Sequence, residues 1–322
     1  MATLRWGIIG SSGWADHTFA PAVGRARGNV LVAVLGSQAA SAQSFAERHG
    51  LAAGYADLQQ FLAHPALDAV WVASPPDLHR AQALAALAAG KHVLCEKPMA
   101  VTVADCKAMV RAATRADRVL AIGFNNRAHP QLRKLAGLVA AGRFGAALEA
   151  RVQVYHAYPS PPPKWRQNRH RSGGWAIGDV GTHLLDLLRW MMQAEPKHAV
   201  GHLSNHCWGF ATDDHAQVSV TFNNGAIGSI TACTGASGGE PRLEFYGTKG
   251  YFILRGGLFG MPGELETGYS GKAATSAAIA GCDTYGAEIE QFALATRGKA
   301  SALARGADGV ANIALVAAAR GW

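Results

Sequence analysis

The segment Trp6-Gly7-Ile8-Ile9-Gly10-Ser11-Ser12-Gly13-Trp14-Ala15 is the most informative part of the sequence for the architecture of the amino-terminal region. It combines a short apolar strand, a tight turn and the start of a helix, the arrangement that holds the pyrophosphate of a dinucleotide. In the G-x-G-x-x-G/A pattern, Gly10 and Ala15 fit the first and third positions, and Ser12 replaces the second glycine. We predict contacts with a dinucleotide for Gly10, Ser11, Ser12, Gly13, Trp14 and Ala15. An ordinary strand-to-helix turn is the alternative.

Short apolar strands alternate with alanine-rich helices as far as about residue 123. We expect strands at 5–9, 30–35, 69–73, 92–95 and 119–122, and helices at 15–25, 39–49, 58–64, 79–89 and 103–115. Such alternation predicts a doubly wound parallel sheet with helices on both faces. Residues 1–123 are therefore predicted to form an α/β Rossmann domain that binds a dinucleotide.

From residue 124 the pattern changes to longer strands with turn residues between them. We expect strands at 147–155, 198–206, 216–222, 225–234, 242–247 and 250–254, and helices at 131–141, 179–192, 285–296 and 306–320. The turn Asn223-Asn224-Gly225 indicates antiparallel neighbours. Residues 124–322 are therefore predicted to form an α+β domain with a large, mostly antiparallel, open-faced sheet for substrate binding and oligomerisation.

Composition excludes several classes of protein. The 322 residues are 49% hydrophobic and 16% charged, which suits two globular domains. The net charge is +8, but the basic residues form no stripe that would indicate nucleic-acid binding. Five dispersed cysteines without a C-x-x-C pair predict reduced thiols and a cytoplasmic location. We expect neither a signal peptide nor a membrane span, because no leader pattern and no apolar run of about 18 residues is present.

The end of the second predicted strand, Val34-Leu35-Gly36-Ser37-Gln38, bears on the choice of cofactor. An acidic residue at this place binds the ribose 2′-hydroxyl of NAD and repels the 2′-phosphate of NADP. Because the acid is absent, we expect a preference for NADP(H), with NAD(H) as the alternative. The nearest basic residues are Arg25 and Arg48. The predicted cofactor contacts here are Gly36, Ser37 and Gln38.

A lysine follows another predicted strand in Val93-Leu94-Cys95-Glu96-Lys97-Pro98. The carboxyl ends of parallel strands meet at the edge where ligands bind. A partly desolvated lysine beside a cationic nicotinamide has a lowered pKa and becomes a usable proton donor. A cis bond before Pro98 would aim Lys97 at the nicotinamide. A surface lysine at a turn is the alternative.

Asp179 and His183 are four residues apart in a predicted helix and therefore share one face. Asp179 is predicted to orient the imidazole, and His183 to exchange a proton with the substrate hydroxyl. The glycines at 173, 174 and 178 are expected to let the preceding loop pass close to a flat ring. An exposed helical pair without a function is the alternative.

These motifs together resemble the glucose-fructose oxidoreductase / inositol dehydrogenase (Gfo/Idh/MocA) family. The resemblance covers nearly the whole chain and includes Gly7-Ile8-Ile9-Gly10, the Glu96-Lys97-Pro98 element, Gly123-Phe124-Asn125-Asn126-Arg127, Trp165-Arg166 and Gly178-Asp179-Val180-Gly181-Thr182-His183. It implies a Rossmann domain, an open-faced sheet through which the family commonly dimerises, and a substrate pocket lined by Lys97, Asp179 and His183. It also implies that Trp165, Arg166 and Tyr285 lie near the cofactor.

Within the family, Ser12 and the non-acidic second strand end resemble the NADP-dependent reductases of 1,5-anhydro-D-fructose. Two positions depart from the family pattern. Trp175 stands where a third glycine is usual, which would reshape the roof of the pocket. The usual basic residue after the second strand is missing, which leaves the cofactor preference open.

Further residues are predicted to contact the cofactor, either at the carboxyl ends of strands or on the nicotinamide side of the cleft: Ser74, Pro75, His79, Glu96, Lys97 and Asn125. For His79 and Asn125, the capping of loops is the alternative. No metal site is expected. His198, His202 and His206 would share a face of one strand, but strand neighbours four residues apart are separated by about 13 Å, too far for one ion.

The sequence leads to two hypotheses. The first is an NAD(P)-dependent oxidoreductase that transfers a hydride between the nicotinamide and a sugar or polyol-like carbonyl or alcohol, including a 1,5-anhydrofructose-type keto-sugar. Either Lys97 or His183 would supply the proton, and Asp179 would hold the imidazole. The second is a non-catalytic cofactor- or sugar-binding sensor on the same fold. Substrate identity, reaction direction and oligomer size stay open.

Overall fold

The computed structural model describes residues 3–320, which form two compact units. The first unit contains the chain up to Ala128 together with Asp283–Val310, and the second contains His129–Cys282 and the chain from Ala311. The expected division at residues 123 and 124 differs from this arrangement in two respects. The first boundary lies five residues later, between Ala128 and His129, and the chain returns to the first unit from Asp283 to Val310.

A seven-stranded sheet forms the centre of the first unit, in the order β15-β6-β5-β4-β1-β2-β3. All neighbours are parallel except β15, which pairs antiparallel with β6. The order of the parallel strands is that of a dinucleotide-binding Rossmann fold, as the sequence predicts. Bounds are β1 (Leu4–Ile9), β2 (Asn29–Leu35), β3 (Gly54–Tyr55), β4 (Ala69–Val72), β5 (His92–Cys95), β6 (Leu120–Ile122) and β15 (Ala304–Arg305).

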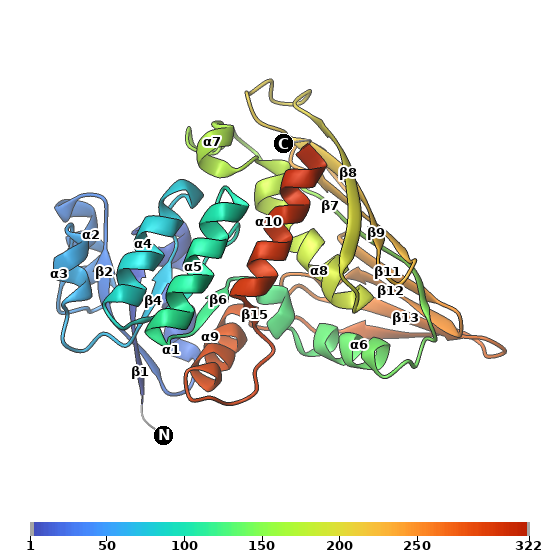
Figure 1. Cartoon of the computed structure of the whole chain (residues 1–322), viewed down its shortest axis with the longest axis horizontal. Coiled ribbons are helices and arrows are strands. Elements are labelled where there is room, and N and C mark those ends of the chain that lie inside the picture. The colour runs from blue at the N-terminus through green and yellow to red at the C-terminus, as the bar shows by residue number, and fades with distance from the viewer. Residues whose placement is uncertain (1–2, 321–322) are drawn as a thin grey trace. The chain divides into compact units, whose positions relative to one another are not determined.

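Helices connect these strands, and α4 and α5 lie side by side (Figure 1). Their bounds are η1 (Ala15–Phe19), α1 (Ala20–Arg25), α2 (Ala39–Arg48), α3 (Leu58–Leu62), α4 (Pro76–Ala88), α5 (Val103–Ala116), η2 (Asn125–Ala128) and α9 (Thr284–Ala295). Helix α4 begins at Pro76, three residues before the expected start, because proline suits the first turn of a helix. The first turn after β1 is a π-helix, η1, followed by α1.

Aromatic packing explains why the returning segment belongs to the first unit. Trp6, Phe19 and Trp71 are fully buried, and the rings of Phe19 and Trp71 stack with centroids 3.7 Å apart. Phe292 of α9 is also fully buried, and its ring centroid lies 4.8 Å from that of Trp6. Burying an aromatic side chain removes a large apolar area from water. The first unit therefore completes its core with residues from the far end of the sequence.

The second unit is built on an eight-stranded sheet in the order β14-β13-β12-β11-β7-β10-β9-β8. Its strands pair antiparallel except β7 and β10, which are parallel. The predicted mostly antiparallel sheet is thus confirmed. Bounds are β7 (Ala147–Tyr155), β8 (Pro196–Ser204), β9 (His215–Phe222), β10 (Ile227–Cys233), β11 (Arg242–Gly247), β12 (Gly250–Gly256), β13 (Gly263–Tyr269) and β14 (Thr275–Ile279).

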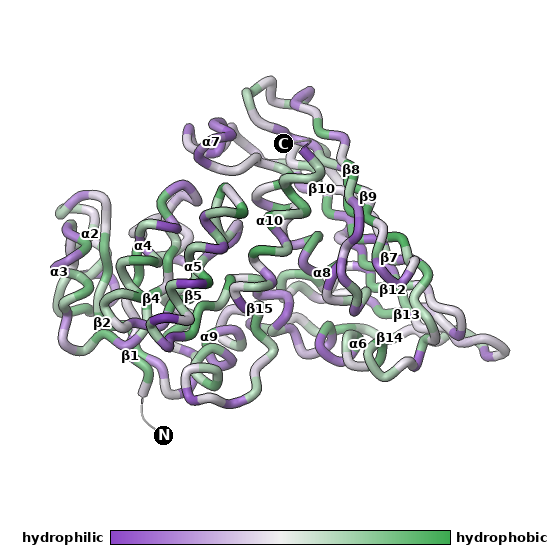
Figure 2. The backbone as a smooth tube through the Cα atoms, viewed as in Figure 1, coloured by the Kyte–Doolittle hydropathy of each residue, from purple (hydrophilic) through white to green (hydrophobic). Residues whose placement is uncertain are grey.

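Helices cover one face of this sheet, and side chains from α6, α8 and the second half of α10 share its hydrophobic core (Figure 1). Bounds are α6 (Pro130–Ala140), α7 (Arg169–Ser172), η3 (Ala176–Gly181), α8 (Thr182–Met192) and α10 (Gly306–Arg320). Buried and exposed residues alternate strictly along β9, as in a sheet with one solvated face. The short helix α7 is strongly hydrophilic (Figure 2).

Strand β8 ends at Ser204, so His206 does not belong to the strand that was expected to carry three histidines. Within residues 3–320, no helix has the length and hydrophobicity that crossing a membrane requires.

Candidate active-site residues and their relatives

The turn after β1 has the geometry expected of a dinucleotide turn. Gly10 has φ +115°, a conformation that side-chain-bearing residues rarely adopt, and a Cβ there would lie 3.0 Å from the carbonyl oxygen of Ala73. Ser12, Gly13 and Trp14 are exposed, so a ligand can reach the backbone of this turn. Ala15 is buried at the start of η1. Exposed backbone ahead of the first helical residues is the arrangement that binds a pyrophosphate in dinucleotide-binding folds, and binding here stays a prediction.

Two further predicted contacts lie against this turn. A Cβ on Gly36 would come within 3.0 Å of the Ser11 hydroxyl oxygen and the Ala42 amide nitrogen, so the end of β2 approaches both the turn and α2. The ring of Tyr285, from α9, meets the half-exposed Trp14 edge-on with centroids 5.8 Å apart. The fold thus gathers residues from both ends of the first unit around the nucleotide turn.

Arg25 and Arg48, which lie near the end of β2 in the sequence, both form ion pairs with carboxylates. Arg48 pairs with Asp16 at 2.9 Å and also donates to Ser44, and Arg25 pairs with Asp283 at 2.8 Å. Ser37 and Gln38 are exposed and uncharged. The residues at this place therefore carry no carboxylate that would repel a 2′-phosphate, and the two arginines are already engaged by carboxylates.

His79 connects two of the turns that follow strands of the parallel sheet. It is completely buried, and its ring nitrogens lie 2.7 Å from the carbonyl oxygen of Ser74 and 3.0 Å from that of Pro98. Burial lowers the pKa of the imidazole. An enclosed imidazole has no surface to offer a nicotinamide, which corrects the predicted direct contact of His79. Instead it links the turn after β4, which contains Ser74 and Pro75, to the turn after β5.

Lys97 follows β5 at that second turn. The Lys97–Pro98 peptide bond is cis, and the Lys97 amide donates to the Glu96 carboxylate at 3.2 Å. The same carboxylate packs against Gly123, where a Cβ would lie 3.1 Å from Glu96 Oε1. Both Glu96 and Lys97 are partly exposed. The lysine therefore stands on the carboxyl edge of the parallel sheet, two strands from the nucleotide turn.

Asn125 is buried in η2, and its amide donates to the Thr284 hydroxyl at 2.9 Å. Its carbonyl oxygen has no hydrogen-bond partner within residues 3–320. This bond ties η2 to the start of α9, the helix that carries Tyr285. Direct contact of Asn125 with a cofactor stays a prediction.

In the second unit, Asp179 and His183 lie on two different helix types. Asp179 is in the π-helix η3, and His183 is in the first turn of α8. A π-helix has more residues per turn than an α-helix, so the spacing of four does not by itself place these side chains on one face. His183 is buried, and its ring meets Phe259 edge-on with centroids 5.1 Å apart.

Arg166 and Tyr158 both contact the Asp179 carboxylate. Arg166 forms an ion pair with it at 3.2 Å, and the Tyr158 hydroxyl donates to it at 3.4 Å. Arg166 also lies over the ring of Trp165 at 4.9 Å. Burial, followed by the Asp179 charge, raises the pKa of Tyr158, which keeps the phenol protonated. The sequence gives no sign of Tyr158, which comes from the loop after β7.

Trp175 is fully buried, so any effect on the shape of a pocket would act through the residues that it packs against. Its ring packs against Tyr158 at 5.4 Å, Trp208 at 5.7 Å and Phe210 at 6.5 Å, measured between centroids.

The neighbouring glycines allow the backbone to pack closely on itself, and the predicted approach of this loop to a flat ring stays a prediction. A Cβ on Gly178 would lie 3.1 Å from the backbone of Ser172 and Gly173, so only glycine fits there without a shift. Gly173 has φ +72° and ends α7 in the left-handed conformation.

The predicted catalytic residues are divided between the units. Lys97 belongs to the first, and Asp179 and His183 belong to the second.

Comparison with known proteins identifies the chain. Residues 4–124 match the model of the oxidoreductase family with an NAD-binding Rossmann fold, and residues 132–253 match the GFO/IDH/MocA carboxyl-terminal domain. A 1,5-anhydro-D-fructose reductase from Ensifer adhaerens is 32% identical over 96% of this chain and 93% of its own. The chain belongs to the Gfo/Idh/MocA family. It is therefore an oxidoreductase with a Rossmann domain for a nicotinamide cofactor.

Solved structures of Gfo/Idh/MocA-like oxidoreductases share this architecture. An oxidoreductase domain protein from Kribbella flavida has a TM-score of 0.90 and 26% identity, covering all of this chain and 97% of its own. The aldose-aldose oxidoreductase from Caulobacter crescentus, complexed with glycerol, has a TM-score of 0.88 and 25% identity, covering 99% and 98%. Both domains of the present chain thus have the family's fold.

Proposed function

We propose that this protein transfers a hydride between NADP(H) and a sugar or polyol-like carbonyl or alcohol, with a 1,5-anhydrofructose-type keto-sugar as the first substrate to test. One observation carries the proposal. Gly10 packs against Ala73, and His79 bonds both Ser74 and Pro98, so the nucleotide turn, the end of β4 and the Lys97 turn are neighbours on one edge of the sheet. The names of the Ensifer and Caulobacter relatives support a sugar substrate.

The nicotinamide would supply the hydride, and the protein would supply positions and protons. The nucleotide turn, Gly36, Ser37, Gln38 and Tyr285 would hold the dinucleotide, with further contacts from Ser74, Pro75, Glu96, Asn125, Trp165 and Arg166. The preference for NADP(H) rests on the missing acid at the end of β2, because Arg25 and Arg48 are paired with carboxylates.

Lys97 or His183 would donate a proton to the carbonyl oxygen as the hydride reaches the carbon. Asp179 would stabilise the imidazolium form of His183, and its own position is set by Arg166 and Tyr158. A carboxylate that is already held in place needs no rearrangement during the reaction.

The experiment is NADPH and NADH oxidation with a panel of keto-sugars, using wild type, Lys97→Ala and Lys107→Ala. Loss of a positioned acid lowers turnover by about 100-fold or more, so Lys97→Ala should lose that much. Lys107 is an exposed lysine of α5, and its removal should leave turnover unchanged. Turnover near wild type in Lys97→Ala would contradict the assignment.

A sensor that binds the cofactor without chemistry is the second candidate. Tight NADPH binding with no turnover of any keto-sugar by wild type would favour it.

We further propose a homodimer formed through the open face of the second sheet. Val200 and Ile227 are 62% and 53% exposed. They pair in register with Ser219 and Thr221 of β9, so these four residues share the face opposite the helices. Exposed apolar side chains on an otherwise polar sheet face mark a surface suited to association.

A further inference from the structure

One residue, Asp213, holds the loop that leads into the segment carrying Asp179 and His183. It lies between β8 and β9, and its carboxylate accepts hydrogen bonds from the amides of Trp175 at 3.2 Å and Ile177 at 2.6 Å. Its backbone carbonyl accepts from the amide between them, that of Ala176, at 3.0 Å. Three consecutive backbone amides at the start of η3 therefore donate hydrogen bonds to one residue. The first amides of a helix lack partners within the helix, and a carboxylate is favourable there.

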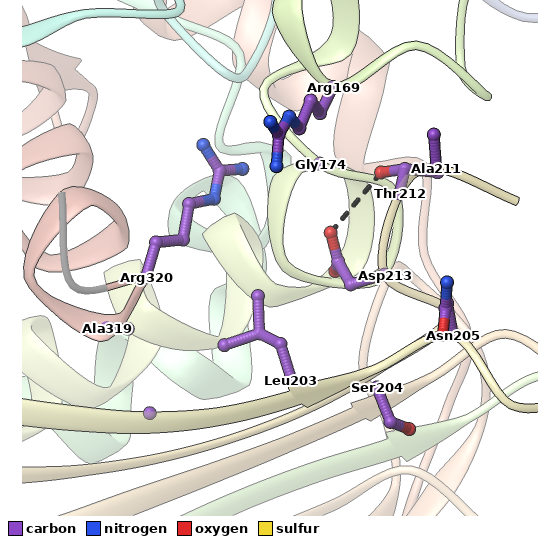
Figure 3. Close-up of a pocket in the computed structure, with 11 residues that line it drawn as sticks. Arg169, Gly174, Leu203, Ser204, Asn205, Ala211, Thr212, Asp213, Ala319 and Arg320 are labelled. Carbon is purple, nitrogen blue, oxygen red and sulfur yellow. Dashed lines mark hydrogen bonds between the residues drawn. The ribbon is translucent and has the colours of Figure 1, made fainter.

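Arg320, at the end of α10, lies close to the same carboxylate. A Cβ on Gly174 would collide with the Arg320 guanidinium and come within 2.6 Å of Asp213 Oδ1, so the three residues meet at one point. They line a cavity of about 360 Å³ together with Thr212, whose hydroxyl donates to Asp213 at 3.4 Å (Figure 3). Burial raises the pKa of Asp213, and its amide donors and the Arg320 charge oppose that rise.

The other end of the same segment is held as well. Asn312 of α10 is buried and donates to the carbonyl oxygen of Thr182 at 2.8 Å. Thr182 directly precedes His183. Residues 175–182 are thus fixed at both ends by side chains that lie far away in the sequence. Asp179 stands between these two anchors.

We propose that Asp213 is a positioning residue for the reaction, and that it fixes the π-helical segment bearing Asp179 and leading to His183 through the backbone amides of Trp175 and Ile177. This inference rests on the proposed function, because it takes Asp179 and His183 as groups that act on the substrate. Displacement of a reacting group by about 1 Å costs about 100-fold in rate. Loss of the anchor should therefore lower kcat more than it changes the Kd of NADPH, whose predicted binding turn lies in the first unit.

Asp213→Ala and Asp213→Asn test the anchor, and Asp214→Asn is the matched control. Asp214 is the adjacent, buried residue, and its carboxylate accepts from the amide of Trp208 at 2.8 Å, outside the segment in question. We expect Asp213→Ala to lower kcat by about 100-fold. Asp213→Asn should lower kcat less, because its side-chain oxygen still accepts a hydrogen bond from one of the two backbone amides. The kcat of Asp214→Asn should stay within about twofold of wild type.

A double-mutant cycle separates positioning from general destabilisation. In an Asp179→Ala/His183→Ala background, followed by single-turnover kinetics at high enzyme concentration, Asp213→Ala should cost little further rate. If Asp213→Ala lowers the single-turnover rate in this background by the same factor as in wild type, the proposal is overturned, because Asp213 would then act independently of Asp179 and His183.

Hydrogen exchange of the folded proteins keeps the test separate from the proposed function. Amides 175–183 should exchange faster in Asp213→Asn than in Asp214→Asn, and unchanged exchange there would overturn the positioning role whatever the activity. If wild type turns over no keto-sugar with either cofactor, the proposed function fails, while the exchange data still decide whether Asp213 holds this segment.

Discussion

Gly10 joins the fold to cofactor binding at the scale of a single residue. Its φ of +115° turns the chain after β1, and its Cα faces the carbonyl group of Ala73. Both constraints act at once, because a side chain there would strain the backbone and also crowd the backbone of Ala73, directly after β4.

Gly10→Ala should therefore destabilise the protein by about 1–3 kcal/mol and weaken dinucleotide binding. Gly13→Ala is the matched stability control, since Gly13 lacks a positive φ and its nearest neighbour is His17 at 4.0 Å. Chemical denaturation and fluorescence titration with NADPH measure the two effects. Equal stability of both variants would show that the turn tolerates a side chain.

For single residues, the sequence predicts which residues follow a strand better than it predicts which side chains are exposed to a ligand. Gly10, Gly36 and Lys97 follow strands, and short apolar strands are readable from composition and spacing. His79 and Trp175 look like ligand-facing residues in the sequence, yet both are buried, because packing within each unit determines where a ring points. The roles of Asp213 and Tyr158 are not predicted from the sequence, because the residues that they bond are distant in sequence.

At the scale of elements, helix α5 shows how a local signal sets a boundary. Thr102 accepts from the Asp105 amide at 3.1 Å and donates to the Asp105 carboxylate at 2.7 Å, so the helix begins at Val103, where the sequence predicts it.

Thr102→Ala should cost about 1 kcal/mol of the free energy of unfolding, and Thr102→Ser should recover most of it because the hydroxyl is restored. Urea denaturation of the two variants and wild type checks this. A Ser variant as unstable as the Ala variant would indicate that the methyl group of Thr102, rather than its hydrogen bonds, supports the helix.

Other elements have no comparable signal. The π-helices η1 and η3 have a different hydrogen-bond register from α-helices, and residue types do not specify that register. Strands β13 and β14 were not predicted, because Gly263–Tyr269 and Thr275–Ile279 contain few large apolar residues. The parallel pairing of β7 with β10 joins strands that are far apart in sequence, which turn signals cannot reveal.

At the scale of the whole molecule, the proposed homodimer makes a direct prediction. Wild type should have a native mass near twice 33.7 kDa. A Val200→Asp/Ile227→Asp variant should be monomeric, because charges on the sheet face oppose apolar burial. Light scattering after size-exclusion chromatography measures both masses.

Leu148→Asp is the control for this prediction. Leu148 is 54% exposed and lies at the irregularity between Ala147 and Glu149 of β7, outside the regular alternation that places Val200 and Ile227 on the open face. It should leave the mass unchanged. A monomeric wild type would reject the dimer.

Phe292 and Trp6, neighbours in one core, are separated by nearly the full length of the polypeptide. A ribosome makes the six parallel strands of the Rossmann sheet first and α9 almost last, after every strand of the other sheet. The aromatic core of the amino-terminal domain therefore lacks Phe292 and the rest of α9, and stays partly exposed, until translation is nearly complete. Chaperone dependence during synthesis should thus concentrate on the half of the protein that is made earliest.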